Sequence, residues 1–243
     1  MNIIFDMDDI ELVSEKIRDF FIHLDSIGHN VAFTSMQHCR DMYPLLDHRF
    51  RKHLFVGANG TITHLNGQLK GVYAFPQIQA ERVIAILDQY QTSYIVEGVW
   101  NYSKKGVNIQ PIFSQKIEGP NREVKYDELG TMIRIMVFPC ENWTKLEEKL
   151  SGLNLQIRYY DHLQVYEITL PEVNKLSAFE SQAFTQNPYI YISQSNMDTN
   201  YYESAFLETS SGKKAAANRI AKLMFKNEQD MNDNMIQQIH PLL

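Results

Sequence analysis

Two aspartates near the N-terminus are the residues best suited to do chemistry. Asp6 and Asp8 follow a short apolar run and are separated by one residue. In an extended strand, residues two apart point to the same face, so the two carboxylates would lie together. Two carboxylates this close either share a proton or hold a cation such as Mg²⁺. One could then attack the phosphorus of a phosphate ester while the other transfers a proton.

The same spacing allows a second interpretation. Acidic residues are also common at the first turn of a helix, where the helix dipole stabilises their charge. The elements that surround Asp6 and Asp8 must therefore decide between a reactive pair and a helix start.

The first 76 residues predict a parallel sheet that would present the pair at its edge. A short apolar run ended by acids is typical of a buried parallel strand, and ligands of open α/β sheets bind beyond the carboxyl ends of such strands. The pattern predicts strands at 2–5, 31–33 and 54–56, helices at 13–24 and 37–46, and a turn at 57–60. This alternation is typical of a doubly wound sheet.

After Pro76 the alternation of strands and helices is interrupted, and it resumes from Pro171. A polar stretch at 101–130 separates the first predicted helix and strand of this region from the rest, and successive strands there can pair antiparallel. We predict an inserted α+β cap domain at 77–170, and an α/β core domain formed by 1–76 and 171–243. The elements expected after residue 76 are helices at 78–90, 141–150, 174–184, 215–223 and the C-terminus, and strands at 94–96, 131–138, 155–159, 163–169 and 189–192.

Composition excludes several classes of protein. The 243 residues are 44% hydrophobic, which is enough for a core, and carry a net charge of -6, which disfavours binding to nucleic acid. The only cysteines, Cys39 and Cys140, support neither a disulfide framework nor a cysteine-based zinc site. No apolar run is long enough to span a membrane and no secretion signal is present, so we expect a cytoplasmic protein without a membrane contact.

The order of short motifs resembles that of the haloacid dehalogenase (HAD) superfamily, in particular its Cof-type phosphatases with a large α/β cap, the IIB-like group. The family has F-D-x-D-G-T after its first strand, then strands that end in T-G-R and S-N-G, a lysine motif after the cap, and a final G-D-x-x-N-D. The matching segments are Phe5–Ile10, Val31–Ser35, Gly57–Gly60, Tyr166–Lys175 and the strand that ends at Ser193.

This resemblance implies a Rossmannoid, HAD-like core and a Mg²⁺-dependent phosphatase that acts on a small phosphorylated metabolite through an aspartyl-phosphate. Asp6 would be the nucleophile, Asp8 the general acid and base, and Lys175 the neutralising cation. The remaining roles implied are phosphate binding by Thr34 and Ser35, a substrate-loop position for Asn59, and metal binding by Asp6, Asp8, Gln194 and Asp198.

Several positions depart from the family pattern. Ile10 replaces a threonine, while Gln194 and Met197 replace an aspartate and an asparagine of the metal motif. A glutamine offers an amide oxygen but no charge, so affinity for Mg²⁺ should fall. A catalytically impaired relative that binds a phosphorylated ligand or a protein partner is therefore the alternative hypothesis, and phosphoryl transfer to an acceptor other than water is a third.

The lysine of the motif also has a rival. Gly212-Lys213-Lys214 could match it instead of Lys175. We prefer Lys175 because a strand leads into it and another apolar strand follows it. The sequence specifies neither the substrate nor the oligomeric state.

Overall fold

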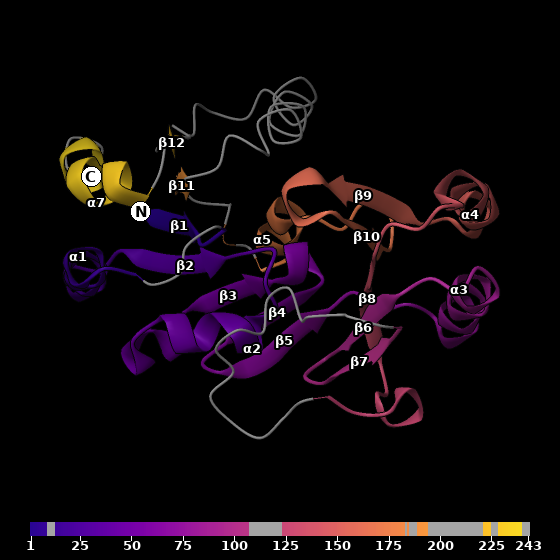
Figure 1. Cartoon of the computed structure of the whole chain (residues 1–243). Helices are drawn as coiled ribbons and strands as arrows, with labels where there is room; N and C mark the ends of the chain where they lie inside the picture. Colours follow the sequence, from indigo (N-terminus) through magenta and orange to yellow (C-terminus); the bar gives the residue numbers. More distant parts are fainter. Residues whose placement is uncertain are drawn as a thin grey trace, which may run out of the picture.

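The protein is built on two β-sheets. The computed structural model describes residues 1–8, 13–106, 123–182, 184, 189–193, 221–224 and 228–239. The larger sheet has seven strands in the order β12-β11-β1-β2-β3-β4-β5, and the smaller has five in the order β7-β6-β8-β10-β9. We call the smaller sheet, with the helices α3 and α4 that cover it, the cap; Figure 1 shows these two helices at the end of the molecule opposite α1 and α7. An α/β core with an α+β insertion confirms the predicted fold class.

Five parallel strands form most of the core sheet. They are β1 (Asn2–Asp6), β2 (Asn30–Thr34), β3 (Leu54–Gly57), β11 (Tyr189–Ser193) and β12 (Ala221–Met224). Two antiparallel strands, β4 (Ile62–Leu65) and β5 (Gln68–Val72), extend it beyond β3. The pattern analysis missed this hairpin, although Asn66-Gly67 marks it: both residues have positive φ, 55° and 68°, as a two-residue hairpin turn requires.

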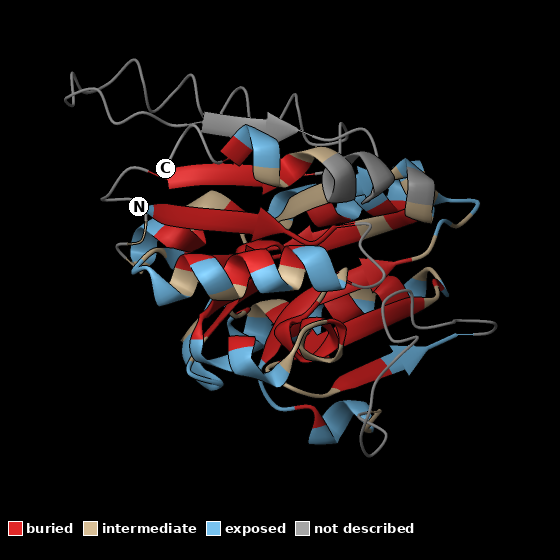
Figure 2. Cartoon of the chain, turned by 90° about the vertical axis from the view of Figure 1, so that its left-hand side faces the viewer, coloured by how far each residue is buried: buried red, intermediate tan, exposed pale blue. Residues whose placement is uncertain are grey.

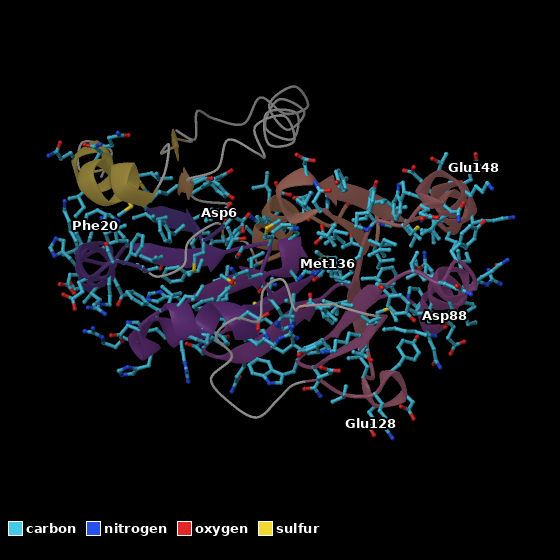
Figure 3. All side chains as sticks on the ribbon, in the orientation of Figure 1. Asp6, Phe20, Asp88, Glu128, Met136 and Glu148 are labelled. Carbon is cyan, nitrogen blue, oxygen red and sulfur yellow. The ribbon has the colours of Figure 1, made fainter. Side chains whose placement is uncertain are left out.

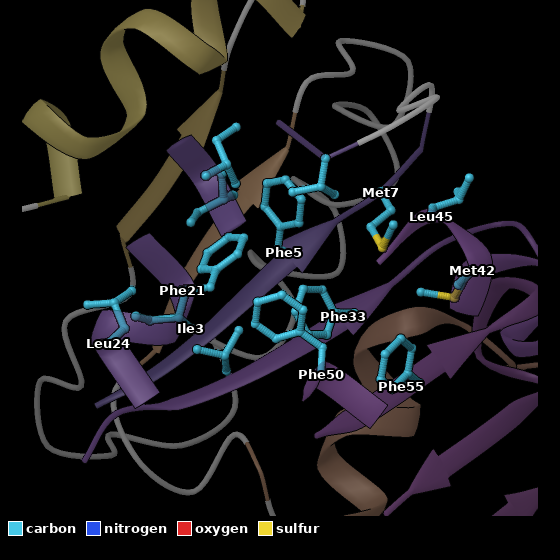
Figure 4. Close-up of a cluster of buried hydrophobic side chains, with 14 of the residues drawn as sticks. Ile3, Phe5, Met7, Phe21, Leu24, Phe33, Met42, Leu45, Phe50 and Phe55 are labelled. Carbon is cyan, nitrogen blue, oxygen red and sulfur yellow. The ribbon is translucent and has the colours of Figure 1, made fainter. Parts of the chain in front are cut away.

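Helices cover both faces of the core sheet. Ile3 and Phe5 of β1 point to the face of α1 (Glu15–Ser26), α2 (Cys39–Met42) and α7 (Glu228–Ile239), where they join the largest apolar cluster. Figure 4 shows rings from β1, α1, β2 and β3 in contact there, with Phe5 and Phe21 4.8 Å apart between centroids. Ile4 points the other way, toward α5 (Lys175–Ser181). Because side chains alternate along a strand, Asp6 faces α5 together with Ile4.

The cap is a half-covered sheet. Its strands are β6 (Tyr94–Gly98), β7 (Tyr102–Lys105), β8 (Met132–Val137), β9 (Gln156–Tyr160) and β10 (Val165–Thr169), paired antiparallel. The helices α3 (Gln77–Gln89) and α4 (Trp143–Leu150) pack apolar residues on one face. The other face turns toward the core and, unusually for a buried surface, carries charged side chains. Figure 2 shows the central strands of the two sheets buried, whereas the helices expose their outer sides. The edge strand β5 is mostly exposed, and β7 is exposed over its second half.

Three expectations about elements need correction. The helix predicted at 37–46 is only α2 followed by a 3-10 turn at Tyr43–Leu45, because Pro44 has no N–H to continue it. The strand predicted at 163–169 begins only at Val165, because Asp161–Leu163 forms a 3-10 turn. Of the helix predicted at 215–223, residues 215–220 lie outside the described residues, and the end forms strand β12.

The remaining single turns are 3-10 helices that connect these elements. They lie at His48–Lys52, Ala58–Gly60, Tyr126–Glu128 and Ser151–Leu153. None of the helices within the described ranges is long and apolar enough to cross a membrane.

Candidate active site

Asp6 and Lys175 form a buried ion pair where β1 ends. Lys175 Nζ lies 3.0 Å from Asp6 Oδ1 and 2.9 Å from Asp6 Oδ2, although 169 residues separate the two in sequence. Both residues are only 2% exposed. Figure 3 shows Asp6 at the end of β1 that approaches the cap, well away from Asp88 and Glu148 on the cap helices. The pair thus lies at the carboxyl end of a central parallel strand, where α/β proteins bind their ligands.

Asp8 completes the group from the loop that follows β1. Its Oδ2 accepts a hydrogen bond from Lys175 Nζ. Its Oδ1 accepts two others, from Ser35 Oγ at 2.9 Å and from the Met36 backbone N–H at 2.6 Å. The Asp8 backbone N–H itself donates to Asp6 Oδ1 at 3.1 Å. Three donors, from Ser35, Met36 and Lys175, thus fix the position of this carboxylate.

The charges of the three groups do not cancel. One ammonium faces two carboxylates, which leaves one negative charge when both are ionised. Burial, and then the neighbouring Asp8, raise the pKa of Asp6 to about 7, against the lowering effects of Lys175 and Tyr191. Because the two carboxylates are buried, they lack the stabilisation that water gives to an ionised carboxylate. A further positive charge at this position would therefore stabilise their ionised forms.

Lys175 is positioned by the start of α5. Asn174 caps this helix with its side chain, which accepts from Ser177 N–H at 2.8 Å. The turn at 58–60 packs against the same point: a Cβ on Gly60 would lie 2.2 Å from the Asn174 carbonyl oxygen, and Gly60 has φ of +98°. Only glycine permits this approach. The geometry places Lys175 at Asp6, while its rivals Lys213 and Lys214 lie outside the described residues.

Tyr191 is a site residue that the sequence analysis did not assign. Its hydroxyl donates to Asp6 Oδ2 across 185 residues of sequence. Strand β11 pairs with β1 so that Tyr191 stands beside Ile4, and both face α5. The period-two pattern identified a buried strand here, but only the order of strands in the sheet shows that its tyrosine reaches Asp6.

The other predicted site residues lie close to this group with different partners. Thr34 pairs with Asp6 in the sheet, but its hydroxyl donates to the Val56 carbonyl at 3.0 Å. The Ser35 hydroxyl is committed to Asp8. In this structure neither hydroxyl hydrogen is directed at a ligand position, so phosphate binding by Thr34 and Ser35 stays a prediction. Gln194 and Asp198, the other predicted metal ligands, lie outside the described residues.

Asn59 contacts the cap. It sits in the 58–60 turn with φ of 54°, and its amide Nδ2 donates to Glu167 Oε1 at 2.9 Å and to Tyr160 OH at 2.8 Å. Its backbone N–H donates to the Ser35 carbonyl at 3.2 Å. This residue therefore connects the loop around Asp8 to the inner face of the cap.

The group is chemically suited to Mg²⁺. This ion takes oxygen ligands and is usually bound by one or two carboxylates, with water and substrate phosphate completing the shell. Asp6 and Asp8 supply two carboxylates with an uncompensated negative charge, which fits such an ion. Within the described ranges, no group of three or more His, Cys, Asp or Glu side chains is arranged to hold a metal ion.

A buried network of charges joins the core to the cap directly above this group. Arg134 of β8, fully buried, bonds Glu97 of β6 and Glu167 of β10. Arg158 of β9 bonds Glu167, and Arg40 of α2 bonds Glu97 at 2.7 Å. No local pattern in the sequence predicts this network. Its members come from four cap strands and one core helix, and become neighbours only when both sheets are formed.

Asp41 at the edge of this network should make stability depend on pH. Its Oδ1 pairs with Arg40, whereas its Oδ2 is buried without a partner among the described residues. Burial raises the pKa of Asp41 from 3.8 to about 7, with Arg40 acting in the opposite direction. The folded state thus holds this proton more tightly than the unfolded chain does. The contribution of Asp41 to the free energy of unfolding is therefore complete below about pH 4 and is lost as pH rises through about 7.

We expect Asp41→Asn to reduce this loss. Urea unfolding at about pH 5 and about pH 8 measures the free energy of unfolding. At the higher pH the variant should be more stable than the wild type by about 1–3 kcal/mol, and at the lower pH the difference should be much smaller. Glu15→Gln, at an exposed ion pair with Arg18, serves as the control because it should show no such contrast. An equal difference at both pH values would contradict a buried, titrating Asp41.

Comparison with known proteins finds similarity along most of the chain. The sequence model of haloacid dehalogenase-like hydrolases matches residues 3–197. No curated protein matches the sequence. Solved structures share the fold at low identity. A haloacid dehalogenase-like hydrolase from Bacteroides thetaiotaomicron has a TM-score of 0.71 at 10% identity, with 98% of each chain covered.

Two further structures show the same similarity. A haloacid dehalogenase-like hydrolase from B. subtilis has a TM-score of 0.69 at 15% identity, covering 97% of this chain and 98% of the other. The HAD subclass IIB sugar phosphatase BT4131 has a TM-score of 0.66 at 13% identity, with 98% of each chain covered. The likeness includes both the core and the cap, and at these identities it shows the fold alone.

Proposed function

Because this chain belongs to the haloacid dehalogenase-like hydrolase family, we propose that it is a Mg²⁺-dependent phosphatase that hydrolyses a small phosphorylated metabolite through an aspartyl-phosphate on Asp6. One observation carries the proposal: Asp6, Asp8 and Lys175 meet in a buried group at the carboxyl end of β1. Two carboxylates and one ammonium are the side chains that a covalent phosphoryl transfer requires.

In the first step Asp6 attacks phosphorus. A bond forms between a carboxylate oxygen of Asp6 and phosphorus, the ester P–O bond breaks, and Asp8 gives its proton to the leaving oxygen. Asp8 Oδ1 is held by Ser35 and Met36 and Oδ2 by Lys175, so the carboxyl that would carry this proton has a fixed position. Lys175, between the two carboxylates, keeps its positive charge next to the transferred group and offsets the charge that develops there.

In the second step water releases phosphate. Asp8, now ionised, takes a proton from the water molecule as its oxygen bonds to phosphorus, and the bond to Asp6 breaks. Mg²⁺ held by Asp6 and Asp8 would supply additional positive charge to the phosphoryl oxygens and to both carboxylates. The buried position of the group beneath the cap would exclude other water during transfer, and side chains of the cap would select the substrate.

Hydrolysis of a chromogenic phosphate monoester tests the proposal. With 4-nitrophenyl phosphate, we expect the purified full chain to release nitrophenol in the presence of Mg²⁺ and to stop when a chelator removes the ion. Ca²⁺ in place of Mg²⁺ is a useful comparison, because its larger shell changes the geometry of an otherwise similar site.

The alternative hypothesis predicts a different result. A catalytically impaired relative would release no nitrophenol and would bind Mg²⁺ weakly in a calorimetric titration. Gln194→Asp would then restore the charge missing from the metal motif and should produce activity. Activity in the variant alone would reject the phosphatase proposal for the natural chain.

A further inference from the structure

Two arginines of the cap donate to backbone carbonyls in the core loops that hold the reactive group. Arg134 Nη1 donates to the Met36 carbonyl at 2.6 Å, and Arg158 Nη2 donates to the Val173 carbonyl at 2.5 Å. Met36 contacts Asp8 through its own N–H, and Val173 lies two residues before Lys175. Each arginine therefore touches a loop that fixes one of the reactive side chains.

Glu167 holds both arginines in place. Its Oε1 accepts from Arg134 Nη1 at 3.0 Å and its Oε2 from Arg158 Nη1 at 3.1 Å. The same carboxylate also accepts from the amide of Asn59, a core residue. Glu167 is fully buried, and Arg134 has a second carboxylate partner in Glu97. A planar guanidinium held by two carboxylates has little freedom, so its remaining N–H points in a fixed direction.

The other bonds of the core loop that Arg134 contacts join it to β3, to the 58–60 turn and to Asp8. Ser35 Oγ accepts from the Gln37 N–H at 2.9 Å while it donates to Asp8. The Gln37 carbonyl accepts from Ala58 N–H at 2.7 Å. Arg134 adds a charged donor at the Met36 carbonyl, and hydrogen bonds from charged donors are stronger than neutral ones. This donor is present only when the cap sits on the core, because β8 belongs to the cap sheet.

We propose that Arg134 is a positioning residue for Asp8: through the Met36 carbonyl it fixes the loop of residues 35–37, and this loop in turn orients the carboxyl of Asp8. This rests on the proposed phosphatase function. Arg134 itself does not contact the reacting atoms. It acts by keeping the Ser35 hydroxyl and the Met36 N–H directed at Asp8 Oδ1, which fixes the orientation of the carboxyl whose Oδ2 contacts Lys175.

Hydrogen exchange tests the structural part without any need for activity. In the full chain, Arg134→Gln should raise the exchange of peptides that contain residues 35–37 by about tenfold, because local opening becomes easier. Arg40→Gln is the matched control: Arg40 is also buried and bonded to Glu97 at the interface, but its other side-chain hydrogen bonds go to Asp41 and to the carbonyls of residues 100 and 101 rather than to the 35–37 loop. Equal exchange at this loop in Arg134→Gln and in the wild type would overturn the proposal.

The kinetic test uses two esters that differ in their need for an acid. Nitrophenolate leaves readily without a proton, whereas the alkoxide of glycerol phosphate requires one. If Arg134 positions Asp8, Arg134→Gln should lower kcat for glycerol phosphate by about 10²-fold with little change in KM, and lower kcat for 4-nitrophenyl phosphate much less. Arg134→Lys, which keeps a charged donor, should recover part of the loss.

The outcomes separate this inference from the function on which it rests. Equal losses for both esters in Arg134→Gln, or a contrast of the same size in Arg40→Gln, would overturn the positioning role. A wild type that hydrolyses neither ester with Mg²⁺ would overturn the proposed function. Unchanged exchange at residues 35–37 would reject the role of Arg134 even in an active enzyme.

Discussion

Asp6→Asn is expected to abolish phosphatase activity while leaving the fold intact. An amide is nearly isosteric with the carboxylate but cannot form an acyl phosphate, so the covalent route is lost. Removal of a nucleophile in comparable covalent enzymes lowers kcat by about 10³–10⁶-fold. Rates with 4-nitrophenyl phosphate and Mg²⁺, compared between variant and wild type, measure the effect.

The same variant should not be less stable than the wild type. Burial raises the pKa of Asp6, which means that the folded protein tolerates its charge poorly. Replacement by a neutral amide removes that cost, and the amide oxygen can still accept from the Tyr191 hydroxyl. Lys175 keeps a charged partner in Asp8, so its ammonium is not left unpaired. An unchanged or higher thermal midpoint would therefore separate loss of chemistry from loss of folding.

A direct assay of the intermediate makes this prediction sharper. After brief exposure to labelled phosphate ester and rapid acid quenching, the wild type should carry label in the peptide that contains Asp6, and Asp6→Asn should carry none. Asp25→Asn is the control, since Asp25 pairs with Lys52 at the surface. Equal turnover in Asp6→Asn and wild type would remove Asp6 as the nucleophile.

Lys175→Met is expected to have the second largest effect, on both stability and turnover. Methionine fills much of the volume of lysine but leaves Asp6 and Asp8 facing each other without a cation. Removing one partner from a buried ion pair typically destabilises a protein by about 3–5 kcal/mol. The loss should be larger at about pH 8 than at about pH 5, because one carboxyl can take up a proton at the lower pH.

Lys52→Met provides the comparison for this variant. Lys52 also pairs with an aspartate, Asp25, but its side chain is 58% exposed, against 1% for Lys175. Exposed pairs contribute only about 0–1 kcal/mol. Urea unfolding and turnover with 4-nitrophenyl phosphate should both separate the two variants. Similar small losses in both would show that Lys175 does not compensate the buried carboxylates.

Much of the fold follows from local patterns. An apolar run followed by Asp6 predicts a buried strand that ends in a carboxylate, and period-two alternation places Asp6 on one face. The helix at 15–26 follows from its apolar spacing, because Ile17, Phe20, Phe21 and Leu24 must lie on one side of it. These features depend on residues only a few positions apart. The β4–β5 hairpin has a local signal too, Asn66-Gly67, which was present but not used.

The candidate site likewise combines features predicted by neighbouring residues with contacts between residues far apart in the sequence. The spacing of Asp6 and Asp8 after an apolar run predicts a pair of carboxylates at a strand end, although the same spacing also allows a helix start. The contacts of Lys175 and Tyr191 with Asp6, across 169 and 185 residues, and the buried charged face of Arg134, Glu97 and Glu167 follow from the tertiary structure alone. The physical reason is that a buried charge is tolerated only beside its partners, and those partners are assembled by the order of strands in two sheets rather than by their neighbours in the chain.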